Sequence, residues 1–456
     1  MVTVGNKRHN AFFDGDNFPA SLRSALSYAS SPSAAARPAR SLHRPCRPPP
    51  TDRTTESHAM FEHIPAYPGD PILSLMEDFQ RDTRPNKVSL SIGIYFDDDG
   101  RLPVMKAVRT AETALLQEIG PRSYLPMEGM ADYRAAVQKL AFGPTHEAVT
   151  SGRVATIQTI GGSGGLKVGG DFLKRYFGDS QVWVSDPTWE NHRAMFEGAG
   201  FQVNLYPYYD PATGGLRFED MLAAFKTLPA RSIVLMHASC HNPTGVDLSQ
   251  DQWKQLIPVI AERGLIPYVD MAYQGFGDGL VEDAFAPRAL ADAGVRFFLA
   301  NSFSKSFSLY GERCGGLSVV CGSAEEAGRV LGQLKSSVRA NYSSPPTHGA
   351  RIVTRVLSTP ELYAQWDAEL AEMRGRIKAM REALHATLAD RLPGRDFGYF
   401  LTQRGMFSYT GLTPEQVDRL REEHAVYPVR SGRMCIAGLS TKNVAYVAQA
   451  MAAVLD

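Results

Sequence analysis

Three apolar runs decide the fold class of this chain: RSIVLMHAS (231–239), GLIPYVD (264–270) and VRFFLANS (295–302). Each has the length and the aliphatic composition of a buried strand. Between the first two lies SQDQWKQLIPVIAERG (249–264), where Ser249 and Gln252 form the Ser–x–x–Gln pattern of a helix start. Strands that alternate with helices predict βαβ units around a mostly parallel sheet covered on both faces.

The same alternation extends from about residue 104 to 365 and includes the apolar run GGLSVVC (315–321). The last ninety or so residues differ, because a charged helix of roughly Leu362–Leu392 precedes two short strand-like pieces, MFSYTGL and RMCIAGL. A chain of 456 residues also exceeds the usual size of one core. We therefore expect a large domain over 104–365 and a smaller α+β domain over 366–456, which 60–103 joins as an N-terminal arm.

Residues 1–59 have a different composition from the remainder. They are rich in Pro, Arg, Ser and Ala and hold eight basic but four acidic residues. Such a segment buries too little apolar surface to offset the entropy of ordering it, which predicts a disordered extension. Met60 opens MFEHIPAYPGD, which looks like a natural start, so we expect translation to begin there. A transit peptide is the alternative.

Charge and cysteine content exclude several classes. Lys and Arg total 48 and Asp and Glu total 48, which favours neither nucleic acid nor a membrane surface as a partner. No apolar run is long enough to cross a bilayer. The five cysteines are scattered without a C-x-x-C pair, which argues against a disulfide framework and a zinc site. We expect a cytoplasmic protein without a bound metal.

The segment NSFSKSFSLYGERCGG (301–316) carries the clearest chemistry. Lys305 lies there between Ser302, Ser304 and Arg313. A lysine whose pKa is lowered forms imines with carbonyl cofactors. Two hydroxyls and a guanidinium suit a phosphate dianion. Taken alone, Lys305 would be interpreted as a solvated loop lysine. Its neighbours Ser302, Ser304 and Arg313 favour a cofactor site instead.

Asp270 closes the apolar run GLIPYVD, and Tyr273 follows three residues later. A carboxylate at the end of a buried strand is costly unless it meets a cation or hydrogen-bond donors. A protonated pyridine nitrogen is such a cation, and Tyr273 could reach a 3-hydroxyl on the same ring. A helix cap is the alternative for this aspartate.

Two further motifs follow predicted strands. In HNPTG (241–245), Asn242 precedes a proline and is held away from the helical region, so that its amide can face a ligand; a simple turn is the alternative. In GGSGG (161–165), which precedes a helical stretch, backbone N–H groups and the Ser163 hydroxyl could bind phosphate.

DPTWENH (186–192) adds Trp189, whose flat face suits an aromatic cofactor, and His192, a partner for a carboxylate. Trp189 could equally be a core residue. The combined inventory holds an amine, a phosphate cradle, an acid for a ring nitrogen, a stacking ring and a donor for a phenolate. Among common cofactors, pyridoxal 5'-phosphate (PLP) requires all of these.

Over residues 60–456 the sequence resembles the class I, fold-type I aminotransferases of the aspartate and aromatic family. The most specific pieces are S-x-S-K ending at Lys305, G-E-R ending at Arg313, HNPTG, DMAYQGF and SGRMCIAGL. The resemblance implies the α/β fold of PLP-dependent transferases, with a mostly parallel seven-stranded sheet flanked by helices in the large domain. It also implies a homodimer with shared active sites.

The resemblance implies a role for each candidate residue. Lys305 would be the Schiff-base lysine and, with Asp270 and Tyr273, the catalytic group. The cofactor would be held by Gly162, Ser163, Trp189, Asn242, Asp270, Tyr273, Ser302, Ser304, Lys305, Arg313 and, across the dimer interface, Tyr124. The substrate would be held by Gly93, Trp189, Asn242, Arg433 at its α-carboxylate and Arg339 of the other subunit at a distal carboxylate, with His192 behind Asp270.

YLPMEGM, DPTWENH and SFSLYGERCGG, together with Ser344, resemble the bacterial tyrosine and aromatic branch. That branch implies transamination of tyrosine and phenylalanine with 2-oxoglutarate, and of aspartate as a further substrate, by a ping-pong mechanism. A strict aspartate aminotransferase shares the same cofactor chemistry. A non-catalytic PLP-binding regulator and a dinucleotide-binding dehydrogenase are less favoured, because 1–59 offers no helix-turn-helix and G-x-G-x-x-G is absent.

Overall fold

The computed structural model describes residues 61–456 except 68, 70 and 119. The chain divides into two units, Met1–Tyr67 and Pro68–Asp456, and every described helix and strand lies in the second. The extension expected over 1–59 and the expected start at Met60 lie outside the described residues.

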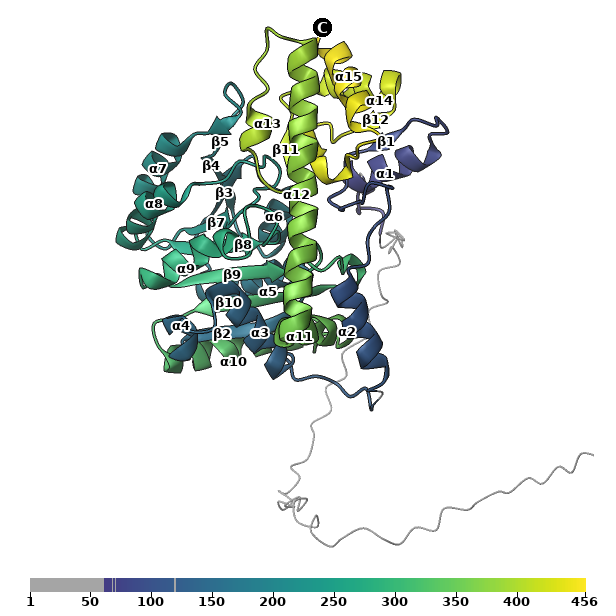
Figure 1. The fold of residues 1–456 in the computed structure, drawn as a ribbon. Coiled ribbons are helices and arrows are strands. Elements are labelled where there is room, and N and C mark those ends of the chain that lie inside the picture. Colours follow the sequence, from purple (N-terminus) through teal and green to yellow (C-terminus); the bar gives the residue numbers. More distant parts are fainter. Residues whose placement is uncertain (1–60, 68, 70, 119) are drawn as a thin grey trace, which may run out of the picture. The chain divides into compact units, whose positions relative to one another are not determined.

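A seven-stranded sheet forms the centre of the second unit (Figure 1). Its order is β2-β10-β9-β8-β7-β3-β4. The β10 strand runs antiparallel to both neighbours, and the other neighbouring pairs are parallel. The strands are β2 (Val154–Ile160), β3 (Val182–Asp186), β4 (Val203–Pro207), β7 (Ile233–His237), β8 (Ile266–Met271), β9 (Phe297–Ser302) and β10 (Cys314–Val320). The predicted strands and the predicted α/β class are confirmed.

Helices cover both faces of this sheet, because alternate side chains of each strand point to opposite faces. On β7, Val234 and Met236 belong to one apolar cluster, and Ile233 and Leu235 to another. The first cluster includes residues of α7 (Phe218–Thr227), α8 (Gln250–Glu262) and α9 (Phe285–Asp292). The second includes α5 (Gly161–Tyr176), α6 (Glu190–Gly198) and α10 (Ala324–Asn341).

Sequence signals were tested at two helix starts. Ser249 and Gln252 form the predicted capping box at the start of α8. The helix that GGSGG was expected to precede begins at Gly161 itself, so the glycine run forms the first part of α5, and phosphate binding there stays a prediction. Small residues there let α5 lie close to the sheet, and a Cβ on Gly165 would be 3.2 Å from the Gly316 carbonyl oxygen.

A third apolar cluster joins segments distant in sequence and packs around the 32-residue helix α12 (Pro360–Arg391). It includes residues of α2 (Lys106–Leu116), α3 (Ala131–Phe142), α11 (His348–Ser358), α14 (Pro414–His424) and α15 (Val444–Leu455). The short strand β1 (Val88–Ser89) pairs with β12 (Val426–Tyr427), so residues before the large sheet lie beside the C-terminal part. The further elements are α1 (Pro71–Arg81), α4 (Glu147–Thr150), β5 (Tyr209–Asp210), β6 (Gly215–Leu216), α13 (Tyr399–Thr402), β11 (Phe407–Tyr409) and β13 (Arg433–Cys435).

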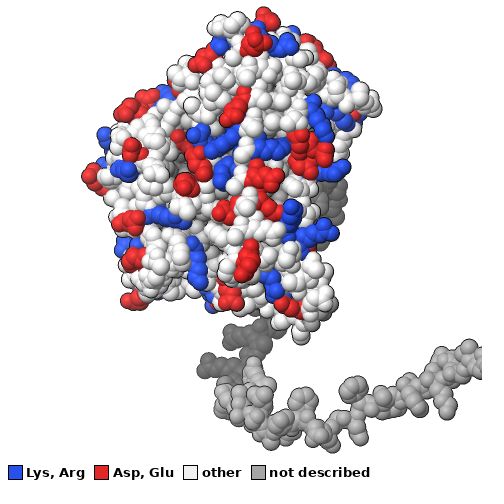
Figure 2. Space-filling view, in the orientation of Figure 1, with Lys and Arg blue, Asp and Glu red and all other residues white. Residues whose placement is uncertain are grey.

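The surface carries both signs of charge. On the face shown in Figure 2, acidic and basic side chains are interspersed, and many form exposed pairs such as Arg193 with Glu197 at 3.0 Å. No helix among the described residues is long and apolar enough to cross a membrane. The described cysteines, Cys240, Cys314, Cys321 and Cys435, are buried free thiols.

Candidate active site

The predicted site residues gather beyond the carboxyl ends of the parallel strands. Asp270 lies near the end of β8, Ser302 ends β9, and Asn242 follows β7. The antiparallel β10 begins at this same edge, directly after Arg313. In open α/β sheets ligands bind at this edge, since loops there converge from several strands.

Lys305 lies in the turn after β9, and its Nζ is 4.9 Å from the centre of the Tyr273 ring. Burial lowers the pKa of this amine to about 8, because an ammonium loses hydration there. The carboxylate of Asp270 opposes the shift, whereas the guanidinium groups of Arg313 and Arg433 add to it. With a pKa of about 8, a fraction on the order of one tenth of the amine is neutral at pH 7, which suits Lys305 to act as a nucleophile and a base.

Asp270 is held by a histidine. Its Oδ2 lies 3.0 Å from Nε2 of His192, whose Nδ1 lies 2.9 Å from the Thr188 hydroxyl. A carboxylate only accepts, so the Nε2 of His192 must carry the proton. Burial alone would raise the pKa of Asp270, but the hydrogen bond from His192 and the electrostatic influence of His192, His237 and Lys305 lower the pKa overall. The other oxygen, Oδ1, is buried and has no hydrogen-bond partner among the described residues.

His237 completes this cluster, and sequence reasoning missed it. Its ring centre lies 5.1 Å from that of His192, and burial lowers its pKa to about 3. Ligand atoms of His192, His237 and Asp270 lie within 4.8 Å of one another, close enough to receive a metal. One nitrogen of His192 and one oxygen of Asp270 are hydrogen-bonded to each other, so these two atoms are not both open to a metal. The expected absence of a metal is not tested by the structure and stays a prediction. His237 could have been selected from the sequence, because it ends the predicted strand that leads to HNPTG.

An anion cradle lies at the start of α5. The backbone N–H of Gly161 donates to the Arg313 carbonyl at 2.8 Å, and a Cβ on Gly161 would be 2.5 Å from the Arg313 guanidinium. Gly162 also lies close to Ser302, since its Cβ would be 3.1 Å from the Ser302 Cβ. Arg313 Nη1 donates to the Ser304 hydroxyl at 3.1 Å. A helix N-terminus, an arginine and hydroxyl groups together favour a phosphate.

Ser163 and Trp189 lie at the starts of two helices beside this edge. Ser163 lies in the first turn of α5. Trp189 is the N-cap residue of α6 and is half-buried, with its ring edge-on to that of His192 at 5.3 Å. The structure therefore places Trp189 beside the residue that holds Asp270.

Arg433 is 2% exposed and faces the loop after β7. It donates to Asn242 Oδ1 at 3.2 Å and to the Ser91 carbonyl at 2.7 Å, while its Nε has no partner among the described residues. Its guanidinium lies 4.6 Å from the centre of the Phe407 ring. Gly93 is close by, because a Cβ there would be 2.8 Å from the same ring. Sequence reasoning missed Phe407, although it lies in the strand-like piece MFSYTGL.

Two predicted site residues, Tyr124 and Arg339, do not contact the other predicted site residues of the same chain in the part that the structure describes. Tyr124 is 94% exposed. Arg339 is exposed near the end of α10 and donates to the Ser343 hydroxyl. Neither side chain bonds to another predicted site residue within the described part of the chain.

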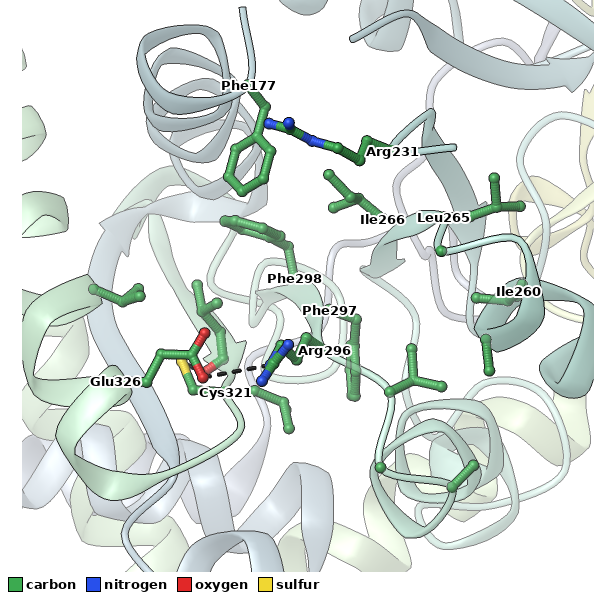
Figure 3. A pocket seen from close by; sticks show the side chains of 18 of the residues that line it. Phe177, Arg231, Ile260, Leu265, Ile266, Arg296, Phe297, Phe298, Cys321 and Glu326 are labelled. Atoms are coloured by element: carbon green, nitrogen blue, oxygen red, sulfur yellow. Dashed lines mark hydrogen bonds and ion pairs between the residues drawn. The ribbon is translucent and has the colours of Figure 1, made fainter. Parts of the chain in front are cut away.

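A separate cavity of about 520 Å³ lies at the opposite edge, where β8 and β9 begin (Figure 3). Phe177 and Phe298 line it, Arg231 lies over the Phe177 ring, and Arg296 pairs with Glu326 at 3.4 Å. None of its lining residues belongs to the predicted site.

The chain is similar to known proteins over most of its length. A family model described as "Aminotransferase class I and II" matches residues 85–451. The "Aromatic-amino-acid aminotransferase" of Escherichia coli (strain K12) is 61% identical over 87% of this chain and 100% of its own. An "Aspartate aminotransferase" of Pseudomonas aeruginosa is 52% identical with the same coverage.

Among solved structures, an aromatic-amino-acid aminotransferase from Burkholderia pseudomallei, covalently bound to pyridoxal phosphate, matches with a TM-score of 0.86. It is 52% identical, and the match covers 87% of this chain and 100% of that one. With a family model over most of its length and relatives of this similarity, the chain belongs to the class I and II aminotransferase family.

Proposed function

We propose that the protein transfers the amino group of aromatic amino acids, above all tyrosine and phenylalanine, to 2-oxoglutarate, with PLP as its cofactor. The observation that carries the proposal is the buried amine of Lys305, which lies within electrostatic range of two groups: Asp270, whose Oδ1 has no hydrogen-bond partner among the described residues, and Arg313 of the cradle. The names of the relatives support the same substrates and cofactor.

The residues fit PLP at each of its polar ends. The buried, unpartnered Oδ1 of Asp270 suits a protonated pyridine nitrogen, because a charge on both partners offsets the cost of burial. Ser302, Ser304 and Arg313 suit the phosphate dianion. When bound, the cofactor supplies an electron sink for the bond broken at the substrate Cα.

The chain's own groups then have distinct tasks. Arg433 binds the substrate α-carboxylate, since its fork is buried and its Nε has no partner in the described part of the chain. The Nζ of Lys305 accepts the proton from the substrate Cα, for which a pKa of about 8 is well matched. His192 keeps Asp270 ionised by donating to it. Tyr273 lies beside Lys305 and Asn242 beside Arg433, and these two side chains would hold the ring hydroxyl of the cofactor.

Dicarboxylate substrates need a second cation, which we assign to Arg339 of a partner subunit. Arg339 is exposed, and among the described residues its guanidinium donates to the short side chain of Ser343, so it can turn toward or away from a bound substrate. We propose aspartate as a further substrate on this basis, with the relatives named for aspartate in support. A strict aspartate aminotransferase is the second candidate.

A homodimer with shared sites is part of the proposal. The exposed Tyr124 supports it, since a tyrosine 94% exposed has no packing role in its own chain. We further propose that 104–365 and 366–456 act as large and small domains, joined by 60–103. A cytoplasmic location is favoured by the buried free thiols.

The test compares the purified protein with Lys305→Ala. The wild type should show the visible absorbance of the lysine–cofactor linkage and should convert phenylalanine, tyrosine and aspartate with 2-oxoglutarate. Lys305→Ala should retain PLP through the phosphate contacts but lose this absorbance and nearly all turnover. Substantial multiple turnover by Lys305→Ala would contradict the assignment. Turnover of aspartate alone by the wild type would favour the second candidate.

A further inference from the structure

Arg381 is a buried cation outside the candidate active site. It lies on α12, is 3% exposed, and burial lowers its pKa to about 9. Its hydrogen bonds all end on uncharged oxygens: the carbonyls of Phe400 (3.4 Å), Gly405 (2.8 Å) and Phe407 (2.6 Å), and the hydroxyl of Ser408. None of these partners is a carboxylate, so the cost of removing the charge from water is only partly offset.

The segment that Arg381 holds leads directly to the carboxylate site. Phe407 lies 4.6 Å from the Arg433 guanidinium, and its ring packs edge-on against Tyr273 at 5.9 Å. In the β11–β13 pair, Ser408 is opposite Met434 and Tyr409 is opposite Arg433. The position of the Phe407 backbone therefore determines what lies beneath the Arg433 side chain.

The N-terminal half of α12 contacts the turn that carries Lys305. Trp366 donates from Nε1 to the Ser306 carbonyl at 2.6 Å and stacks on Phe307 at 4.5 Å. Trp366 and Arg381 are both on α12, and a helix rises about 1.5 Å per residue, so these attachments are about 22 Å apart along its axis. A continuous helix is stiff, and it links the backbone beside Lys305 to the backbone beside Arg433.

We propose that Arg381 is a positioning residue for the substrate carboxylate, which holds Phe407 beneath Arg433 and so sets the place of Arg433 relative to Lys305. The inference rests on the proposed function, because it takes Arg433 as the ligand of the α-carboxylate.

The expected consequence of losing Arg381 is specific. The carbonyls of Gly405 and Phe407 would be left buried without their donor, and the segment would move to find other partners. Arg433 would keep its bonds to Asn242 and Ser91, so a carboxylate site would persist with altered geometry. The segment reaches Lys305 indirectly, through the Tyr273 ring, so Lys305 and the phosphate cradle should be affected less. Carboxylate affinity should therefore fall while the proton transfer at Lys305 is largely retained.

The experiment uses the holoenzyme and the unreactive monocarboxylate 3-phenylpropionate as the probe. Arg381→Met should weaken its binding about tenfold and raise KM for phenylalanine similarly, with kcat changed less than about threefold. PLP content and visible absorbance should match the wild type. Arg381→Lys should recover part of the affinity, because an ammonium can still donate to these oxygens.

Arg288→Met is the matched control. Arg288 also donates to main-chain carbonyls, those of Ala141 at 3.0 Å and Leu140 at 3.4 Å, but it holds the end of α3 instead. Its loss should change probe affinity by less than about twofold. Equal weakening in Arg288→Met and Arg381→Met would overturn the inference, as would unchanged affinity in Arg381→Met.

Should Arg381→Met fail to fold, two milder variants decide. Ser408→Ala removes one acceptor, and Phe407→Leu removes the ring; probe affinity should fall in both, and the double variant should lose less than the sum of the two effects. Additive losses, or unchanged affinity in Ser408→Ala and Arg381→Lys, would overturn the inference. If the wild type fails to transaminate phenylalanine, the proposed function fails, yet the probe affinities of the same variants still test Arg381.

Discussion

Replacing Gly169 with Ala should destabilise the protein, although Ala is the better helix former. Gly169 lies in α5, where an added Cβ would be 2.1 Å from the Tyr268 hydroxyl and 2.8 Å from two of its ring atoms. Tyr268 is fully buried, stacks on Phe298 at 5.4 Å and donates to the Gly165 carbonyl at 2.9 Å. Neither the ring nor its hydroxyl can move aside without losing these contacts.

The magnitude combines three contributions. Overpacking of a dense core costs about 1–3 kcal/mol, the lost Tyr268 hydrogen bond about 1 kcal/mol, and the change from Gly to Ala in a helix returns about 1 kcal/mol. We therefore expect a loss of about 1–3 kcal/mol in the free energy of unfolding. Adding Tyr268→Phe removes the 2.1 Å contact and should recover part of this loss.

Urea unfolding at fixed protein and PLP concentrations measures the difference. Gly328→Ala is the control, because Gly328 is exposed in α10 and its Cβ would meet nothing within 4 Å; it should stabilise by about 0.5–1 kcal/mol. A Gly169→Ala protein as stable as the wild type would refute the reasoning. The outcome also bears on the site, since α5 carries the cradle at its N-terminus.

Four further predictions concern the site. Asp270→Ala should slow the amino-acid half-reaction by about a thousandfold or more in stopped-flow measurements, and an effect under tenfold, about 1.4 kcal/mol, would contradict its role. Arg339→Leu should lower kcat/KM for aspartate about a hundredfold in the half-reaction and that for phenylalanine much less; equal losses would refute dual specificity. Mixed Lys305→Ala and Arg339→Ala subunits should regain part of the dicarboxylate activity, and no recovery after confirmed subunit exchange would count against shared sites. In the cofactor-free protein, the Lys305 amine has a pKa of about 8 against an ordinary 10.5, so it binds its proton less tightly folded than unfolded. The free energy of unfolding should therefore rise between pH 8 and 10.5 relative to that of Lys305→Met. A difference between the two proteins that does not change with pH would show that the amine is not desolvated.

Local pattern was enough to predict the parallel sheet, the helices on both faces and the capping box of α8. Strand and helix periodicity express burial directly, so β7, β8 and β9 coincide with their apolar runs. Lys305, Asp270 and Arg313 could be selected because their residue types suit one cofactor and each lies beside a predicted strand end. The first residue of α5 was placed after the glycine run, whereas the helix begins at Gly161, because close approach to the sheet outweighs the low helix propensity of glycine.

Only the tertiary structure decided which distant groups meet. Arg433 and Asn242 are 191 positions apart in the chain, and no local signal joins them. Nothing in MFSYTGL indicates that Phe407 lies beneath Arg433, or that Arg381 of α12 holds that strand. The sequence by itself determined the elements and the kinds of chemistry they carry, because these depend on neighbours along the chain. The protonation of Lys305, the free oxygen of Asp270 and the clamp of Arg381 depend on desolvation and on partners that packing alone brings together.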